Sequence, residues 1–245
     1  MNTKARLFCI PYAGGSAAVF YMWKKYLHPD IELFPIELSG RGRRMRAPLY
    51  NNIGEAVDDI YETVKSYLDD APYAIFGHSM GSCLAYELYH KISELNHQCA
   101  EHVFFSGRVS PCDDIEKENT YLLPDKDFIQ QVFDLGGMSK EFLNNEILMN
   151  IFLPVLRADY KIIDTYEPIA RMNRISCDIS VLTGVRDRMT KSADIKRWGA
   201  YTDNECFFYE FDEGHFFINS YIDNVVNIIN DRITDVLYKR HMIVT

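Results

Sequence analysis

The chain has 245 residues, of which 47% are hydrophobic and 25% are charged, and its formal net charge is −9. A chain of this length and composition can bury a sizeable core, so we expect one domain over residues 1–245. The negative charge argues against nucleic-acid binding, which needs a basic face to neutralise phosphates. The sequence has no run of about eighteen apolar residues, so we expect no membrane contact.

The first residues do not have the pattern of an export signal. The apolar run in MNTKARLFCIPY is short and ends at Pro11. Six cysteines are scattered along the chain, without a C-x-x-C pair and without histidines at zinc-site spacing. We therefore expect a cytoplasmic protein with reduced cysteines and no metal site.

Six short apolar runs predict strands at 6–12, 31–38, 73–79, 102–107, 178–184 and 206–211. Most runs are continuous rather than alternating, as in a parallel sheet covered on both faces. Apolar residues at three- and four-residue spacing predict helices over 54–68, 82–95 and 225–238. This alternation predicts an α/β fold with a mostly parallel sheet flanked by helices.

The segment SGRGRRMRAP follows the second predicted strand and gathers Arg41, Arg43, Arg44 and Arg46 in one loop. The simplest interpretation is a solvated loop. The alternative is a docking site for an anionic ligand or partner.

The segment GHSMG at 77–81 matches G-x-S-x-G, with a predicted strand before it and a predicted helix after it. A strand, a sharp turn and a helix form the nucleophile elbow of α/β-hydrolases. In such an elbow the serine has a strained backbone, so its neighbours must be small. We expect Ser79 to be the nucleophile and the Met80 N–H to stabilise the oxyanion.

A serine nucleophile needs a base, and in this fold an acidic residue and then a histidine follow it along the chain. His215, in DEGHFFI, follows a predicted strand and a glycine, and it is the best-placed histidine. Asp187 follows the end of the strand ISVLTG, where the acid is expected. The less well-placed candidates are Asp178, Asp194, Asp203 and Asp212. A structural loop histidine, or ion pairing of Asp187 with its arginine neighbours, is the alternative.

Residues from about 110 to 168 have helical patterns but no strand-like run. A helical insertion between two strands suggests a lid over the site, where apolar helices would hold acyl chains and exclude water. A structural helical extension is the alternative.

The loop PYAGGSA after the first predicted strand has small residues, which let backbone N–H groups approach a substrate. We expect Ala13 to give the second oxyanion donor, with Gly14 as the next choice. The loop is not a phosphate-binding loop, because no Gly-Lys-Ser/Thr follows it.

Taken together, PYAGGSA, ELSGRGRRMRAP, FGHSMG, LTGVRDRM and DEGHFFI resemble the type II thioesterases of nonribosomal peptide and polyketide assembly lines. The resemblance keeps the order of the motifs, includes the helical insertion and covers nearly the whole chain. It implies an α/β-hydrolase with a Ser79, Asp187 and His215 triad. One departure is Ser39, where the family more often has proline, and this leaves the shape of the arginine loop open.

The resemblance also implies the substrate, which is an acyl group on the 4′-phosphopantetheine arm of a carrier protein. No enzyme cofactor is then needed, because the arm belongs to the partner. Carrier proteins are usually acidic, so Arg41, Arg43 and Arg44 are the candidate docking residues, in an enzyme that we expect to be a monomer. Lys191, Lys196 and Arg197 could extend this patch. A small-molecule esterase or lipase, and a catalytically silent binding protein, remain alternatives.

Overall fold

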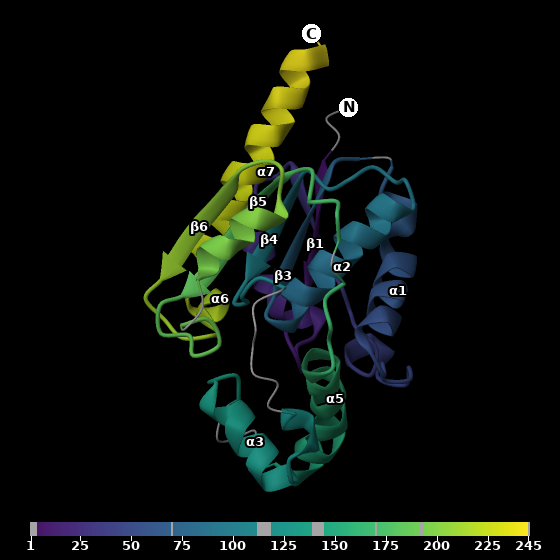
Figure 1. Ribbon diagram of the computed structural model, residues 1–245, viewed down its shortest axis with the longest axis vertical. Helices are drawn as coiled ribbons and strands as arrows, with labels where there is room; N and C mark the ends of the chain where they lie inside the picture. Colours follow the sequence, from purple (N-terminus) through teal and green to yellow (C-terminus); the bar gives the residue numbers. More distant parts are fainter. Residues whose placement is uncertain are drawn as a thin grey trace.

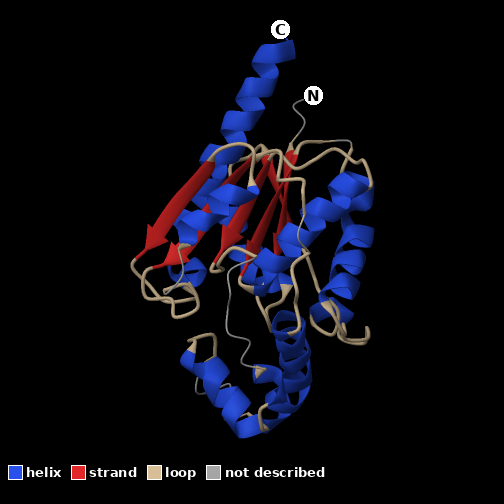
Figure 2. Cartoon of the chain, in the orientation of Figure 1, coloured by secondary structure: helices blue, strands red, loops and turns tan. Residues whose placement is uncertain are grey.

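The structure is a computed structural model that describes residues 4–69, 71–111, 119–138, 145–169, 171–191 and 194–244. It contains a six-stranded sheet in the order β2-β1-β3-β4-β5-β6, in which every neighbouring pair is parallel. The strands are β1 (Ala5–Ile10), β2 (Ile31–Pro35), β3 (Tyr73–His78), β4 (His102–Ser106), β5 (Asp178–Gly184) and β6 (Cys206–Phe211). All arrowheads therefore lie at one edge of the sheet (Figure 2). The predicted α/β class and parallel sheet are confirmed.

Helices cover both faces of this sheet (Figure 1). The α-helices are α1 (Ile53–Val64), α2 (Met80–Glu94), α3 (Asp125–Asp134), α5 (Glu146–Asp164), α6 (Phe217–Ser220) and α7 (Ile222–Val244). The 3₁₀ helices are η1 (Ala17–Lys25), η2 (Gly42–Arg44), η3 (Lys65–Tyr67), η4 (Thr120–Leu122) and η5 (Ile195–Tyr201). Helices α1, α2 and η5 pack on one face, and η1, α6 and α7 pack on the other. None of the helices in the described ranges is both long and apolar enough to cross a membrane.

The continuous apolar pattern of the strands follows from this double cover. In β1, Phe8 and Ile10 point into the core under α1 and α2, whereas Leu7 and Cys9 point into the core under η1 and α7. Successive side chains of a strand alternate between the two faces of the sheet. A strand buried on both faces therefore has apolar residues at consecutive positions. Burial also raises the pKa of the Cys9 thiol. Among the cysteines, Cys112 lies outside the described residues.

Between β4 and β5, the described elements η4, α3 and α5 are all helical, while 112–118 and 139–144 lie outside the described residues. These helices lie beyond the carboxyl edge of the sheet (Figure 1). Helices α3 and α5 share a small apolar core of Phe128, Val132 and Leu156, against which Ala13 from the loop after β1 also packs. The insertion is thus joined to the sheet edge at the loop that follows β1.

Candidate active site

Ser79 occupies the sharp turn between β3 and α2, with φ 55° and ψ −114°. Its neighbours must be glycines because the turn is tight. A Cβ atom on Gly77 would lie 2.0 Å from the Gly81 carbonyl oxygen, and one on Gly81 would lie 2.2 Å from the Ile10 carbonyl oxygen. Ser82 braces the turn, donating from Oγ to the Gly77 carbonyl at 2.8 Å. This is the geometry of a nucleophile elbow.

Asp187 and His215 form a buried pair at the same edge of the sheet. His215 Nδ1 lies 2.8 Å from Asp187 Oδ2, and the side chains are 5% and 0% exposed. An ionised carboxylate can only accept, so Nδ1 carries the proton and Nε2 keeps a free lone pair. The other Asp187 oxygen accepts from the Met189 N–H at 2.9 Å, which holds the carboxylate in place. The pair can therefore act as an oriented base.

The strand order places these three residues at one edge of the sheet. Ser79 follows β3, Asp187 follows β5 and His215 follows β6, and parallel strands end at one edge. His78, next to the serine, has its ring centroid 5.1 Å from that of His215. The arrangement is the Ser, Asp, His order that α/β-hydrolases use.

His78 is buried at the end of β3, next to Ser79. Its ring is 0% exposed, and Nδ1 lies 2.8 Å from Ser106 Oγ. Burial, followed by the proximity of His215, lowers the pKa of His78 well below its usual value. This ring therefore stays neutral and packs against the His215 ring.

Two aromatic side chains that the sequence analysis did not select flank the same edge. The Phe216 ring centroid lies 5.0 Å from that of His215 and 4.9 Å from that of Tyr12. A Cβ atom on Gly137 would lie 2.5 Å from Phe216 Cζ, so Phe216 also contacts the helical insertion. A phenylalanine next to a histidine has no motif of its own, and only the fold shows this position.

The two expected oxyanion donors come from the elbow, which contains Met80, and from the loop after β1, which contains Ala13. Met80 is the first residue of α2, so its N–H has no acceptor within the helix. Within the described residues, the Ala13 N–H donates to no acceptor in the protein. Gly14, the second choice, is committed elsewhere, because its N–H donates to Asp159 Oδ2 at 2.7 Å. Of these two N–H groups, the one on Gly14 is thus already engaged, and the oxyanion role of Ala13 stays a prediction.

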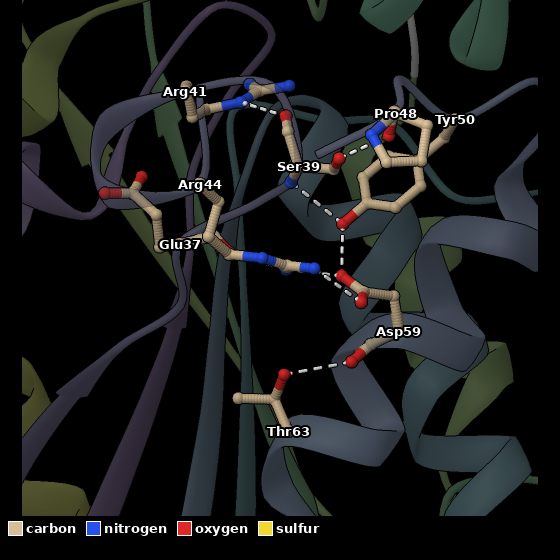
Figure 3. Close-up of polar contacts among 8 residues, drawn as sticks. All are labelled: Glu37, Ser39, Arg41, Arg44, Pro48, Tyr50, Asp59 and Thr63. Atoms are coloured by element: carbon tan, nitrogen blue, oxygen red, sulfur yellow. Dashed lines mark hydrogen bonds and ion pairs between the residues drawn. The ribbon is translucent and has the colours of Figure 1, made fainter. Parts of the chain in front are cut away.

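The arginine loop was expected to expose Arg41, Arg43 and Arg44 for docking. This prediction is wrong for Arg41, which is buried. Arg41 is 7% exposed, and its guanidinium binds both oxygens of Asp159 at 2.6 and 2.7 Å. Arg44 is half-buried and pairs with both oxygens of Asp59 on α1, at 2.5 and 2.7 Å (Figure 3). Both side chains hold the loop to the protein. Only Arg43 and Arg46 of the four arginines have exposed side chains.

Ser39 closes the base of this loop, which explains the serine at this position. Its Oγ donates to the Pro48 carbonyl, and its N–H donates to Tyr50 Oη at 3.0 Å (Figure 3). Tyr50 donates in turn to Asp59. Burial alone would raise the pKa of Asp59, but the hydrogen bonds from Arg44 and Tyr50 lower it. The loop is thus a closed polar network around an ionised carboxylate.

The described residues contain no group of three or more His, Cys, Asp or Glu side chains placed to hold a metal ion. The groups at the carboxyl edge of the sheet are of the types that nucleophilic acyl transfer uses: a serine on a tight turn, a histidine bonded to a carboxylate, and backbone N–H groups.

Comparison with known proteins agrees with this chemistry. The family pattern described as a thioesterase domain matches residues 5–233. Gramicidin S biosynthesis protein GrsT of Aneurinibacillus migulanus is 33% identical over 215 residues, which cover 88% of this chain and 83% of GrsT.

Solved structures show the same similarity. The crystal structure of ClbQ from the colibactin NRPS/PKS pathway has a TM-score of 0.90 at 33% identity, covering 96% of this chain and 98% of ClbQ. The structure of the type II thioesterase BorB from the borrelidin biosynthetic cluster has a TM-score of 0.85 at 27% identity, covering 94% of this chain and 93% of BorB. With the family pattern matched over most of its length, this α/β-hydrolase chain belongs to the thioesterase domain family and is an enzyme that hydrolyses thioesters.

Proposed function

We propose that this thioesterase removes acyl or aminoacyl groups from the phosphopantetheine arm of carrier proteins in a nonribosomal peptide or polyketide pathway. The observation that carries the proposal is the buried Asp187–His215 pair at the sheet edge that also bears Ser79 on its elbow. The similarity to ClbQ, from an NRPS/PKS pathway, and to the type II thioesterase BorB supports the substrate class.

In the first half of the proposed reaction, Ser79 Oγ attacks the carbonyl carbon of the thioester and forms a C–O bond. The serine proton passes to Nε2 of His215, and Asp187 stabilises the imidazolium that results. The carbonyl oxygen becomes an oxyanion, to which the N–H groups of Met80 and Ala13 donate. The C–S bond then breaks, and the thiol of the arm leaves with the histidine proton.

In the second half, His215 takes a proton from water, and the hydroxide oxygen attacks the acyl-serine carbonyl. The same two N–H groups stabilise the second oxyanion. Breakage of the C–O bond to Ser79, with return of the proton to its oxygen, releases the free acid. No cofactor bound to the enzyme takes part, since the arm belongs to the substrate.

We propose that the apolar helices η4, α3 and α5 act as a lid that covers the acyl group. Helices α3 and α5 share the apolar core residues Phe128, Val132 and Leu156, and Phe216, next to His215, also contacts Gly137 of the insertion. An apolar cover would exclude water until the acyl group has been transferred to the serine.

We also propose a revised docking patch for the carrier protein. Arg43 and Arg46 keep exposed side chains in the loop after β2, and Lys191, Lys196 and Arg197 are exposed in the segment after β5. Both segments follow the carboxyl ends of strands, where the arm must enter. Local positive charge can attract an acidic partner although the whole chain is acidic, because salt limits each charge to a range of about 8 Å.

The test is a comparison of kcat/KM for one acyl group presented in three ways: on a carrier protein, as an N-acetylcysteamine thioester and as an aryl ester. The proposal expects the acyl-carrier protein to be the preferred substrate by at least about tenfold, since only it offers the arm and the partner surface. Preference for the aryl ester would instead identify a small-molecule esterase.

A further inference from the structure

Asp159, in the middle of the long helix α5, is buried beside the loop that follows β1. Its side chain is 1% exposed, and it accepts three hydrogen bonds. The Gly14 N–H donates to Oδ2 at 2.7 Å, while Arg41 donates to Oδ2 at 2.6 Å and to Oδ1 at 2.7 Å. Bidentate pairs between a guanidinium and a carboxylate have a fixed geometry. One carboxylate therefore joins the helical insertion, the loop after β1 and the arginine loop.

Arg41 holds the same loop from its other side. Its Nη1 also donates to the Gly15 carbonyl at 3.0 Å, and its Nε donates to the Ser39 carbonyl at 3.1 Å. Ser39 is itself fixed by Tyr50 and Pro48. The Gly14 N–H and the Gly15 carbonyl, in the first and third peptide groups after Ala13, are thus anchored, one by Asp159 and the other by Arg41.

Helix α5 also packs directly on this loop. A Cβ atom on Gly14, which has φ +75°, would lie 2.6 Å from Phe152 Cζ and 2.9 Å from Leu156 Cδ1. Ala13 packs against the apolar core to which both of these side chains belong. The position of α5 and the conformation of the loop therefore depend on each other.

We propose that Asp159 and Arg41 are positioning residues that hold the Ala13 N–H in place as an oxyanion donor, an inference that rests on the proposed function. The Ala13 N–H belongs to the peptide group of Tyr12 and Ala13, whose carbonyl accepts from the Gly15 N–H at 2.8 Å, so anchoring Gly14 and Gly15 also restrains this peptide group. A donor fixed in advance stabilises an oxyanion without reorganising during the reaction. Displacement of such a group by about 1 Å can cost about 100-fold in rate. The lid helix thereby contributes to the chemistry through a carboxylate that touches no substrate.

The test compares Asp159→Asn with the wild-type chain by kcat, by KM for an acyl N-acetylcysteamine thioester, and by the inhibition constant of an alkylthio trifluoromethyl ketone. The serine oxygen adds to the carbon of this ketone, the serine proton passes to the histidine, and the ketone oxygen becomes an oxyanion. We expect kcat to fall about 100-fold, the inhibition constant to rise by a similar factor, and KM to change less than about threefold.

The matched control is Glu87→Gln, which breaks another buried ion pair. Glu87 is 8% exposed, and its Oε2 lies 2.7 Å from Arg171 Nη2. Its other partner in the described residues is Tyr166, so the control does not touch the loop after β1. Glu87→Gln should lose stability but keep kcat and the inhibition constant within about threefold. If Asp159→Asn does not fold, the double variant Asp159→Asn with Arg41→Gln leaves no unpaired charge and is measured in the same way.

Three results would overturn the positioning role. The first is an Asp159→Asn variant with wild-type kcat, and the second is a fall in its kcat with an unchanged inhibition constant. The third is an equal change in kcat and the inhibition constant for Asp159→Asn and Glu87→Gln. In each case an active wild-type chain would leave the proposed function standing. A wild-type chain that does not hydrolyse thioesters would overturn both.

Discussion

Ser79, the proposed nucleophile, has a backbone conformation that is unfavourable for a residue with a Cβ atom. Its φ of 55° is in a region where a Cβ atom is crowded, and such residues cost about 1–3 kcal/mol each. The surrounding structure maintains this conformation through the Ser82 hydrogen bonds and the close approach of Gly77 and Gly81. The turn presents the hydroxyl at the edge of the sheet at the expense of stability.

This strain predicts a difference between two inactive variants. Ser79→Gly should be about 1 kcal/mol more stable to unfolding than Ser79→Ala, because glycine adopts positive φ without a Cβ clash, a gain only partly offset by its greater freedom in the unfolded chain. Urea denaturation of both variants measures the difference. Equal midpoints and slopes would show that the elbow is not strained.

Asp187 is the proposed acid of the triad. Asp187→Asn should lower kcat about 10⁴-fold, because the amide no longer holds His215 in the tautomer with a free Nε2. Steady-state hydrolysis of an acyl thioester measures it. Asp212→Asn is the control, since Asp212 is exposed and pairs with Arg186 at 2.7 Å. A near-silent Asp187→Asn beside a damaging Asp212→Asn would reverse the assignment.

The strands and the elbow could be predicted from the sequence because they follow local patterns. Contacts between residues far apart in the chain could not. The six strands and the elbow have short sequence signatures, which come from double-sided burial and from a turn that only glycine permits. Arg41 and Asp159 are 118 residues apart, and nothing local to either residue points to the other. An arginine-rich loop looks the same in sequence whether its side chains face solvent or a buried carboxylate. The prediction for Arg41 was wrong for that reason.

The exposed arginines of the loop after β2 are expected to assist binding of the carrier protein. Arg43→Glu with Arg46→Glu should raise KM for acyl-carrier protein about 3- to 10-fold at low salt, and less at high salt, because exposed charges act on encounter and are screened. Hydrolysis of an N-acetylcysteamine thioester should change little. Steady-state kinetics at two salt concentrations provide the measurement.

The control for charge alone is Lys24→Glu with Lys25→Glu. These exposed lysines end η1, before the start of β2, and the substitution changes net charge by the same amount. It should leave KM for the carrier unchanged. If both double variants raise KM equally, overall charge rather than a docking patch governs the encounter.

At the scale of the whole molecule, buried neutral histidines make the fold sensitive to acid. His102, at the start of β4, is 1% exposed and lies 2.8 Å from Ser180 Oγ through Nε2. Burial, followed by the positive charge of Arg232, lowers the pKa of His102 to about 3. The unfolded chain therefore binds a proton between about pH 6.5 and pH 3 that the folded chain does not, and stability falls as pH falls through this window.

His102→Phe should remove this contribution. The dependence of unfolding free energy on pH between about 6 and 4 should become shallower by about 1.4 kcal/mol per pH unit, which is one proton. Urea denaturation across that range, on the wild-type chain and the variant, gives the two slopes. Parallel curves would mean that His102 is protonated in the folded protein.

In the proposed reaction, Ser79 accepts an acyl group from a carrier protein and passes it to water. The most direct measurement is the intact mass of one acyl-carrier protein after incubation with the wild-type chain or with Ser79→Ala. We expect the wild-type chain to return the carrier to the mass of its free-thiol form, and Ser79→Ala to slow this loss by about 10⁴-fold or more. Loss of the acyl group at the same rate with both proteins, or its retention with both, would contradict the proposed mechanism.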